Sequence, residues 1–337
     1  MDYFGPGTGE SSPAGPRREA NMGANAGVRK ARSESELREP TDFGQGSYVE
    51  AQVLVTNSCN LKCSHCFVFR DDNPNSPRDK MDDATMLHQL RRLRDKHGIR
   101  SMLFVGGEPM IRKELVLKAM KLFEKCSIVT NGTYGIPSVP GHGVTVSLDG
   151  PEGPNDAIRG EGVFQKVKQA IFERDPADGT SVIVQMVLTK QNEAHLEAFV
   201  EEVKDWPISG LAFTFYVPTR DDQSPLVWHD LGERDRVVER LIALKRSYPG
   251  LIKSHIGALE MMMSEVCMDS IGENGGKCQL RKALPLYMGE KSSFERTFCC
   301  YGNDVDCPRC GSYMVFNQAY HLAQGNEGHL PITGGRI

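Results

Sequence analysis

The sequence lacks several features that would place the protein in a particular class. It contains no run of about 18 apolar residues, so we expect no transmembrane helix. The N-terminus has no apolar segment of the kind that marks a secretory signal. The formal net charge of -4 at pH 7 gives no indication of a nucleic-acid or anionic-membrane partner. We therefore expect a cytoplasmic protein without a nucleic-acid partner.

Large apolar residues are also scarce at both ends of the chain. Residues 1–46 are rich in Gly, Pro, Ser, Arg and Glu, and cannot bury enough surface to offset the conformational entropy of the chain. We predict a mostly disordered leader there, and a flexible, glycine-rich tail at residues 321–337. Between them we predict two domains, an α/β domain at 47–250 and a cysteine-rich domain at 251–320.

Strand and helix patterns alternate through the first of these domains. Apolar runs predict strands at 51–56, 101–105, 127–130, 144–148, 181–189 and 211–217. Helical periodicity predicts helices at 82–97, 113–125, 162–174, 193–205 and 231–247. The alternation indicates a parallel sheet with right-handed crossovers, and six repeats fit a partial (β/α)6 TIM-type barrel or an open doubly wound sheet. The connection between the third and fourth strands is too short and too rich in Pro and Gly for an ordinary helix.

Cysteine, by contrast, is plentiful, and seven of the ten cysteines lie in closely spaced groups. In a long chain without a signal sequence, this grouping favours metal binding over disulfides. Cys59, Cys63 and Cys66 follow the first predicted strand with the spacing C-x3-C-x2-C. Three ligands from one loop suit a [4Fe–4S] cluster that has one iron left open. His65, inside the loop, is an alternative fourth ligand.

The cysteine triplet, followed by the aromatic Phe67, resembles the signature of the radical S-adenosylmethionine (SAM) superfamily. The resemblance implies a [4Fe–4S] cluster whose fourth iron is chelated by the amino and carboxylate groups of SAM. It also implies that the reduced cluster cleaves SAM to methionine and a 5′-deoxyadenosyl radical, which abstracts a hydrogen atom from the substrate. A one-electron donor such as ferredoxin or flavodoxin is implied as a partner.

Two further elements of the resemblance end the second and third predicted strands. FVGGEP at 104–109 resembles the family's GGEP element, where Gly106 and Gly107 allow close backbone approach and Glu108 is expected to hold the SAM amino group. TNG at 130–132 places Asn131 at the end of the third strand, as in relatives.

A fourth element, VSLDGPEGPNDAIRG at 146–160, resembles the family's fourth-strand region. We expect Ser147 and Asp149 near the ribose or carboxylate of SAM. Arg159 is expected either to steady that carboxylate or to form a structural ion pair with Asp149 or Asp156. The resemblance covers roughly residues 50–215.

A second group of cysteines follows the predicted barrel. Cys307 and Cys310 form a C-x2-C pair, and we predict Cys278 and Cys300 as the other two ligands. The arrangement resembles the auxiliary-cluster extensions of radical SAM enzymes, called SPASM and twitch-like. Six cysteines fall short of the seven in SPASM, so we expect one auxiliary [4Fe–4S] cluster, with zinc as the alternative. Two cysteines are left over, Cys267 and Cys299, and one of them could replace a predicted ligand.

The sequence therefore predicts a radical SAM enzyme of unresolved subclass, whether oxidoreductase, lyase or transferase. A small biosynthetic molecule or natural-product intermediate is the favoured substrate. Alternatives are a peptide, or a lipid such as a hopanoid that receives the adenosyl group. An alternative of another class is a non-catalytic iron–sulfur or zinc protein with a regulatory role.

Overall fold

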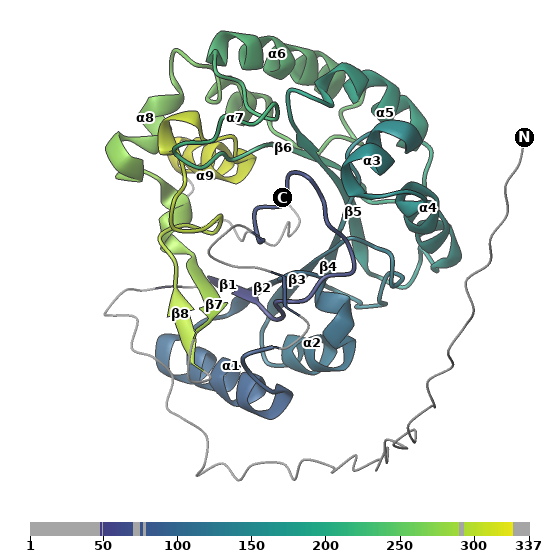
Figure 1. Ribbon diagram of the computed structural model, residues 1–337, viewed down its shortest axis with the longest axis vertical. Helices are drawn as coiled ribbons and strands as arrows, with labels where there is room; N and C mark the ends of the chain where they lie inside the picture. Colours follow the sequence, from purple (N-terminus) through teal and green to yellow (C-terminus); the bar gives the residue numbers. More distant parts are fainter. Residues whose placement is uncertain (1–47, 49, 70–74, 77–78, 290–292, 326–337) are drawn as a thin grey trace, which may run out of the picture. The chain divides into compact units, whose positions relative to one another are not determined.

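The computed structural model describes residues 48, 50–69, 75–76, 79–289 and 293–325 (Figure 1). The predicted leader at 1–46 and most of the predicted tail lie outside these residues. Within the described ranges, no helix combines the length and the apolar character that a membrane span requires.

One eight-stranded sheet, in the order β6-β5-β4-β3-β2-β1-β7-β8, organises the described residues. Its six core strands are β1 (Glu50–Leu54), β2 (Ser101–Val105), β3 (Lys125–Thr130), β4 (Gly143–Ser147), β5 (Ser181–Leu188) and β6 (Gly210–Phe215). All six are parallel. They coincide with the six predicted strands, and the predicted α/β fold with a partial barrel is confirmed.

Helices cover the outside of this sheet (Figure 1). They are α1 (Asp83–His97), α2 (Lys113–Met120), α3 (Glu152–Arg159), α4 (Val163–Glu173), α5 (Leu196–Val203) and α6 (Leu231–Ser247). Asp82 caps α1 by accepting a hydrogen bond from the Thr85 amide at 2.8 Å. The sequence did not predict α3, whose first turn contains Gly153 and Pro154. Between β3 and β4 the chain forms only turns and irregular structure, as its Pro- and Gly-rich sequence predicted.

β1, β2 and β6 are buried along nearly their whole length, which fits their continuous apolar runs, whereas β4 and β5 alternate buried and half-buried residues. On one face, Ala51 and Val53 of β1 pack in the same core as Met86 and Leu90 of α1. On the other face, Leu54 packs in a smaller cluster with side chains of β2 and of the loop that follows β1. This second face is therefore the one toward which the first cysteine loop folds.

The segment after residue 250 pairs with both edges of the six-stranded core. On one edge, β7 (Leu284–Met288) lies parallel to β1, and β8 (Phe294–Arg296) lies antiparallel to β7. The chain then reaches the other edge, where the Phe215 amide of β6 donates to the Gly311 carbonyl at 2.8 Å. The sequence predicted no strand here, because Pro285 within β7 argues against one.

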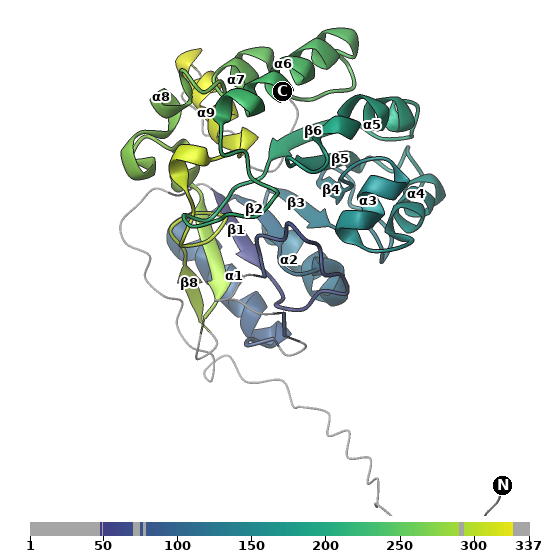
Figure 2. The same cartoon turned by 45° about the horizontal axis from the view of Figure 1, so that its top comes forward.

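Three helices complete this segment: α7 (Ile256–Glu260), α8 (Cys267–Ile271) and α9 (Tyr313–Ala323). They lie together beside α6 (Figure 2). The Tyr313 amide at the start of α9 donates to Thr214 of β6 at 3.2 Å, which ties the helix to the sheet. The predicted boundaries of a separate domain at 251–320 stay a prediction, whereas the pairing of this segment with the sheet is a feature of the structure.

Candidate functional site

The three thiols of the first cysteine site, Cys59, Cys63 and Cys66, lie in the loop after β1 and are partly exposed. Cys63 interacts electrostatically with both of the other thiols, so the three lie close together. Burial raises the pKa of the Cys63 thiol to about 11, and burial likewise raises the pKa of Cys59. Such thiols ionise readily only when a metal takes the place of the proton. The loop therefore suits a metal group that supplies positive charge.

The glycines of the GGEP element bring the end of β2 against the start of this loop. A Cβ atom on Gly107 would lie 2.1 Å from the Ser58 carbonyl oxygen, and one on Gly106, with φ +155°, would lie 2.8 Å from the Thr56 oxygen. The Gly107 amide donates to the Thr56 oxygen at 3.0 Å. Glycine is required here for contact between two backbones. Close approach of the same glycines to SAM stays a prediction.

Glu108 joins the ends of β2 and β3 from a fully buried position. Its carboxylate accepts hydrogen bonds from the Met110 amide (2.8 Å), the Thr130 hydroxyl (2.7 Å) and the Asn131 amide (2.7 Å). Burial nevertheless raises the pKa of Glu108 above its ordinary value. A carboxylate has about four acceptor positions, so roughly one remains after these three donors.

Two other predicted site residues, Asn131 and Phe67, make contacts in or next to the first cysteine loop. The Asn131 side-chain amide lies 3.8 Å from the Cys59 sulfur and donates to the Asn60 side chain at 2.9 Å. The Phe67 ring lies 5.0 Å, centroid to centroid, from the ring of Tyr301 in the C-terminal segment. The first contact lies within the predicted site, and the second connects the cysteine loop to the second group of cysteines.

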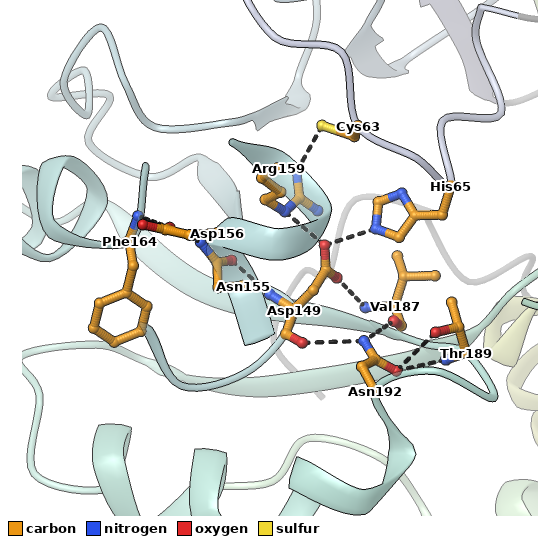
Figure 3. Close-up of polar contacts among 10 residues, drawn as sticks. All are labelled: Cys63, His65, Asp149, Asn155, Asp156, Arg159, Phe164, Val187, Thr189 and Asn192. Carbon is orange, nitrogen blue, oxygen red and sulfur yellow. Dashed lines mark hydrogen bonds and ion pairs between the residues drawn. The ribbon is translucent and has the colours of Figure 1, made fainter. Parts of the chain in front are cut away.

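At the end of β4, Asp149 is fully buried and lies at the centre of a polar network (Figure 3). Its Oδ2 is 2.6 Å from His65 Nε2 and forms an ion pair of 2.6 Å with Arg159 Nε, while Oδ1 accepts from the Val187 amide at 2.9 Å. Burial by itself would raise the pKa of Asp149, but Arg159 and His65 hold it well below its ordinary value. An ionised carboxylate only accepts, so His65 Nε2 carries the proton. Ser147 is the last residue of β4, two positions before Asp149, and is half-buried.

This network shows which protein groups Arg159, Asp156 and His65 contact. Arg159 forms its ion pair with Asp149, whereas Asp156 accepts hydrogen bonds from two backbone amides of the following turn and helix. His65, considered as a metal ligand, instead uses Nε2 to bind Asp149. Arg159 also lies with Nη1 3.9 Å from the Cys63 sulfur. No sequence signal paired His65 with a carboxylate 84 positions away.

The second group of cysteines lines a small cavity. Four thiols line it, from Cys278, Cys299, Cys307 and Cys310, which we call the second cysteine site. Cys300 does not line this cavity; it is buried beside β1, where its carbonyl accepts from Gln52 at 2.8 Å. The structure therefore brings Cys299, and not the predicted Cys300, together with the other three. Cys299 and Gly302 close a tight turn through two backbone hydrogen bonds, and Cys300 lies within this turn, so the chain changes direction between the two cysteines.

A buried cation stands beside the second cysteine site. Arg234 of α6 is 1% exposed and donates to the carbonyl oxygens of Cys310 (3.0 Å) and Met262 (2.6 Å). It forms no ion pair within the described part of the chain. Burial raises the pKa of Cys299 to about 11 and that of Cys310 further above its ordinary value. An uncompensated buried charge is costly, so the surroundings of Arg234 suit an anionic group.

A family model described as the radical SAM superfamily matches residues 53–203, which include the whole first cysteine site and the network around Asp149. The chain is 28% identical over 168 residues to a probable GTP 3′,8-cyclase of Methanocella arvoryzae, covering 47% of this chain and 53% of that protein. It is 30% identical over 159 residues to the mycofactocin maturase MftC of Mycolicibacterium smegmatis, covering 43% and 39%. The chain thus spans about half or less of the length of these relatives.

Solved structures show the same fold. Native anSMEcpe with bound AdoMet superimposes with a TM-score of 0.56 at 18% identity, over 75% of each chain. Streptococcus suis SuiB bound to S-adenosylmethionine superimposes with a TM-score of 0.52 at 18% identity, over 72% of this chain and 58% of SuiB. The family match, together with the cysteine loop after β1, places residues 53–203 in the radical SAM superfamily, and the solved structures share this fold.

Proposed function

We propose that the protein is a radical SAM enzyme in which Cys59, Cys63 and Cys66 hold a [4Fe–4S] cluster and the neighbouring strand ends bind SAM. The observation that supports this most strongly is the convergence of groups from the ends of β1 to β4. The three thiols meet Asn131 from the end of β3 and Arg159 from the helix that follows β4. When bound, such a cluster reduces SAM and releases methionine and the 5′-deoxyadenosyl radical that abstracts hydrogen from the substrate.

The contacts that Glu108 and Asp149 already make indicate different roles for these two carboxylates in SAM binding. Glu108 keeps roughly one acceptor position beyond its three protein donors, and we assign this position to the SAM amino group. Asp149 already binds three protein groups, with hydrogen bonds to His65 and the Val187 amide and an ion pair to Arg159, so we assign it to holding Arg159 and His65. Ser147, half-buried at the end of β4, is then our candidate for the SAM ribose.

We further propose that the second cysteine site holds a closed [4Fe–4S] cluster, with Cys299 in place of the predicted Cys300. The cavity is lined by four thiols, and Arg234 supplies a buried positive charge for a cluster of thiolate ligands. Within the described residues, no group of three or more His, Cys, Asp or Glu is arranged around a single metal ion. Zinc needs its sulfurs about 2.3 Å from one ion, whereas cluster ligands bind different irons and stand farther apart. With four ligands the cluster has no open iron, which favours electron transfer or support of the fold.

For the substrate, we propose a small biosynthetic molecule. The relatives that match about half of this chain include GTP 3′,8-cyclases, whose name states a nucleotide substrate. The reaction also needs an electron from outside the protein, and we propose ferredoxin or flavodoxin as the donor.

Anaerobic reconstitution with iron and sulfide tests the proposal. We expect about eight irons per chain, and release of 5′-deoxyadenosine from SAM when dithionite is added. The matched control replaces all three cysteines of the first site by alanine, which should leave about four irons and no cleavage. Binding of two zinc ions with no SAM cleavage would instead support a non-catalytic regulatory protein and overturn the proposal.

A further inference from the structure

We propose that Arg159 is a positioning residue that raises the reduction potential of the cluster held by Cys59, Cys63 and Cys66, and that His65 and Asp149 fix it in place. The inference rests on the proposed function, because it assumes a cluster on these three cysteines. It goes beyond that function by assigning the control of the cluster's potential to a buried network of this chain.

The first argument is the geometry of the guanidinium. Arg159 is the last residue of α3 and is 7% exposed. Its Nε is 2.6 Å from Asp149 Oδ2, and its Nη1 is 3.9 Å from the Cys63 sulfur (Figure 3). A guanidinium is planar and its donors have fixed directions. Once Nε is held by Asp149, the direction of Nη1 toward the sulfur is set as well.

The second argument is that the carboxylate is itself held rigidly. Asp149 accepts from the Val187 amide of β5 at 2.9 Å through Oδ1, and its backbone carbonyl accepts from the Asn192 side chain at 3.0 Å. Its amide donates to Asn155 of α3 at 3.0 Å. Because β4, β5 and α3 all contribute to this arrangement, Asp149 offers a stable anchor for the guanidinium.

The third argument is that the two residues after Cys63 tie the cysteine loop to this network and to α3. His65, two residues after Cys63, lies 2.6 Å from the Asp149 oxygen that also binds Arg159. The Ser64 amide donates to the Ile158 carbonyl in α3 at 3.1 Å. The loop and α3 are therefore tied together next to Cys63, so the distance between guanidinium and sulfur is controlled by two independent contacts.

The expected effect follows from charge. Reduction adds a negative charge to the cluster, and a buried cation beside a ligand sulfur stabilises the reduced form more than the oxidised form. Asp149 opposes this effect, but its carboxylate pairs with Arg159 Nε, whereas Nη1 of the same guanidinium lies 3.9 Å from the sulfur. The network as a whole therefore favours reduction, which is the step that SAM cleavage requires.

The test is a potentiometric titration of the reconstituted enzyme followed by EPR. The first cluster's signal is identified as the one that changes when SAM is added, and is then titrated without SAM. In Arg159→Gln we expect the ratio of reduced to oxidised cluster at a fixed potential to fall at least tenfold, equivalent to about 59 mV for a one-electron couple. In Arg159→Lys, which keeps the charge but not the planar contact, we expect a potential between those of the unaltered enzyme and Arg159→Gln. Arg240→Gln is the matched control, because Arg240 pairs with Glu197 away from the network.

An unchanged potential in Arg159→Gln, with full iron content, would overturn the inference. If SAM binding weakens while the potential stays the same, Arg159 serves the SAM carboxylate and the inference is also wrong. If Arg159→Gln fails to retain iron, Arg159→Lys tests it instead: the charge stays but loses the planar contact that directs it toward the sulfur, so the potential should fall, and no fall would overturn the inference. Absence of a SAM-responsive signal in the unaltered enzyme would count against the proposed function rather than this network.

Discussion

The two cysteine sites differ in how the chain assembles them. The first takes its three thiols from eight consecutive residues of one loop, Cys59 to Cys66, and is surrounded by ionised and polar side chains such as Arg159 and Asp149. The second takes four thiols from segments up to 32 positions apart, between Cys278 and Cys310, in a largely apolar cavity beside one buried cation. The first site is thus a local motif that charged groups tune, whereas the second is a product of the way the C-terminal segment folds.

This difference implies different consequences of losing each site. The first loop projects from the end of β1 and forms none of the sheet's pairings. The second site lies on the segment that pairs with β1 on one edge of the core sheet and with β6 on the other. We therefore expect damage at the first site to remove chemistry, and damage at the second to remove stability as well.

The largest expected effect is at the first site. Cys63→Ser should abolish release of 5′-deoxyadenosine and reduce iron from about eight to about four per chain, because three ligands are the minimum for this cluster. The free energy of unfolding of the cluster-free protein should change by less than about 0.5 kcal/mol, since the thiol is partly exposed. Iron analysis, product chromatography and urea denaturation measure these quantities. A large loss of stability would break the comparison between the two sites.

Two adjacent cysteines provide a matched pair at the second site. Cys299→Ser should lower iron to about four per chain, and Cys300→Ser should keep about eight, because only Cys299 faces the cavity. Both variants replace a thiol by a hydroxyl, at the half-buried Cys299 and at the buried Cys300, so they share the chemical change of the substitution. The opposite result would restore Cys300 as the ligand and contradict the side-chain placement in the structure.

Arg234→Met tests whether the stability of the second site depends on a buried counter-charge. In the loaded enzyme we expect a loss of about 3 kcal/mol of unfolding free energy, because an anionic cluster would lose its buried counter-charge. In cluster-free protein the loss should be clearly smaller, because there the arginine is a buried charge without an ion-pair partner in the described part of the chain. Denaturation of both forms, with Arg240→Gln as the control, gives the difference. Equal losses in the two forms would show that Arg234 acts only through its two carbonyl contacts.

The smallest expected effect concerns His255, which precedes α7 near the second site. Burial, the neighbouring His321 and Lys245 lower the pKa of His255 from its ordinary 6.5. The unfolded state therefore binds the proton more readily, so stability is present above about pH 6.5 and declines as the pH falls below it. In His255→Gln this decline should be shallower. Thermal unfolding of cluster-free protein between pH 7.5 and 5.5 measures it, and an identical slope in both proteins would contradict the prediction.

Most of the fold and the first cysteine site could be predicted from the sequence. The six core strands are apolar or alternating runs that the parallel sheet buries on at least one face, and their carboxyl ends meet at one edge whatever the details of the loops. Cys59, Cys63 and Cys66 follow directly after β1, so their proximity is a matter of local spacing. Glu108 and Asn131 follow β2 and β3 for the same reason and lie where they were expected.

Other features depended on contacts between distant parts of the chain. The pairing of His65 with Asp149 joins residues 84 positions apart, and nothing in either segment specifies it. The choice between Cys299 and Cys300 depends on which face of the backbone meets the cavity. The strand β7, which contains Pro285, forms because an open edge of β1 is available to it.

The sequence by itself determined the parallel α/β sheet, the triplet of cysteines at the end of its first strand and the family to which they belong, because these follow from periodicity and short-range spacing. Only the tertiary structure decided which cysteines share the second cavity, and that Arg159 is held between Asp149 and Cys63. Those outcomes depend on the packing of segments far apart in the chain, where the cost of leaving a charge or a polar group unpaired in the interior selects one arrangement.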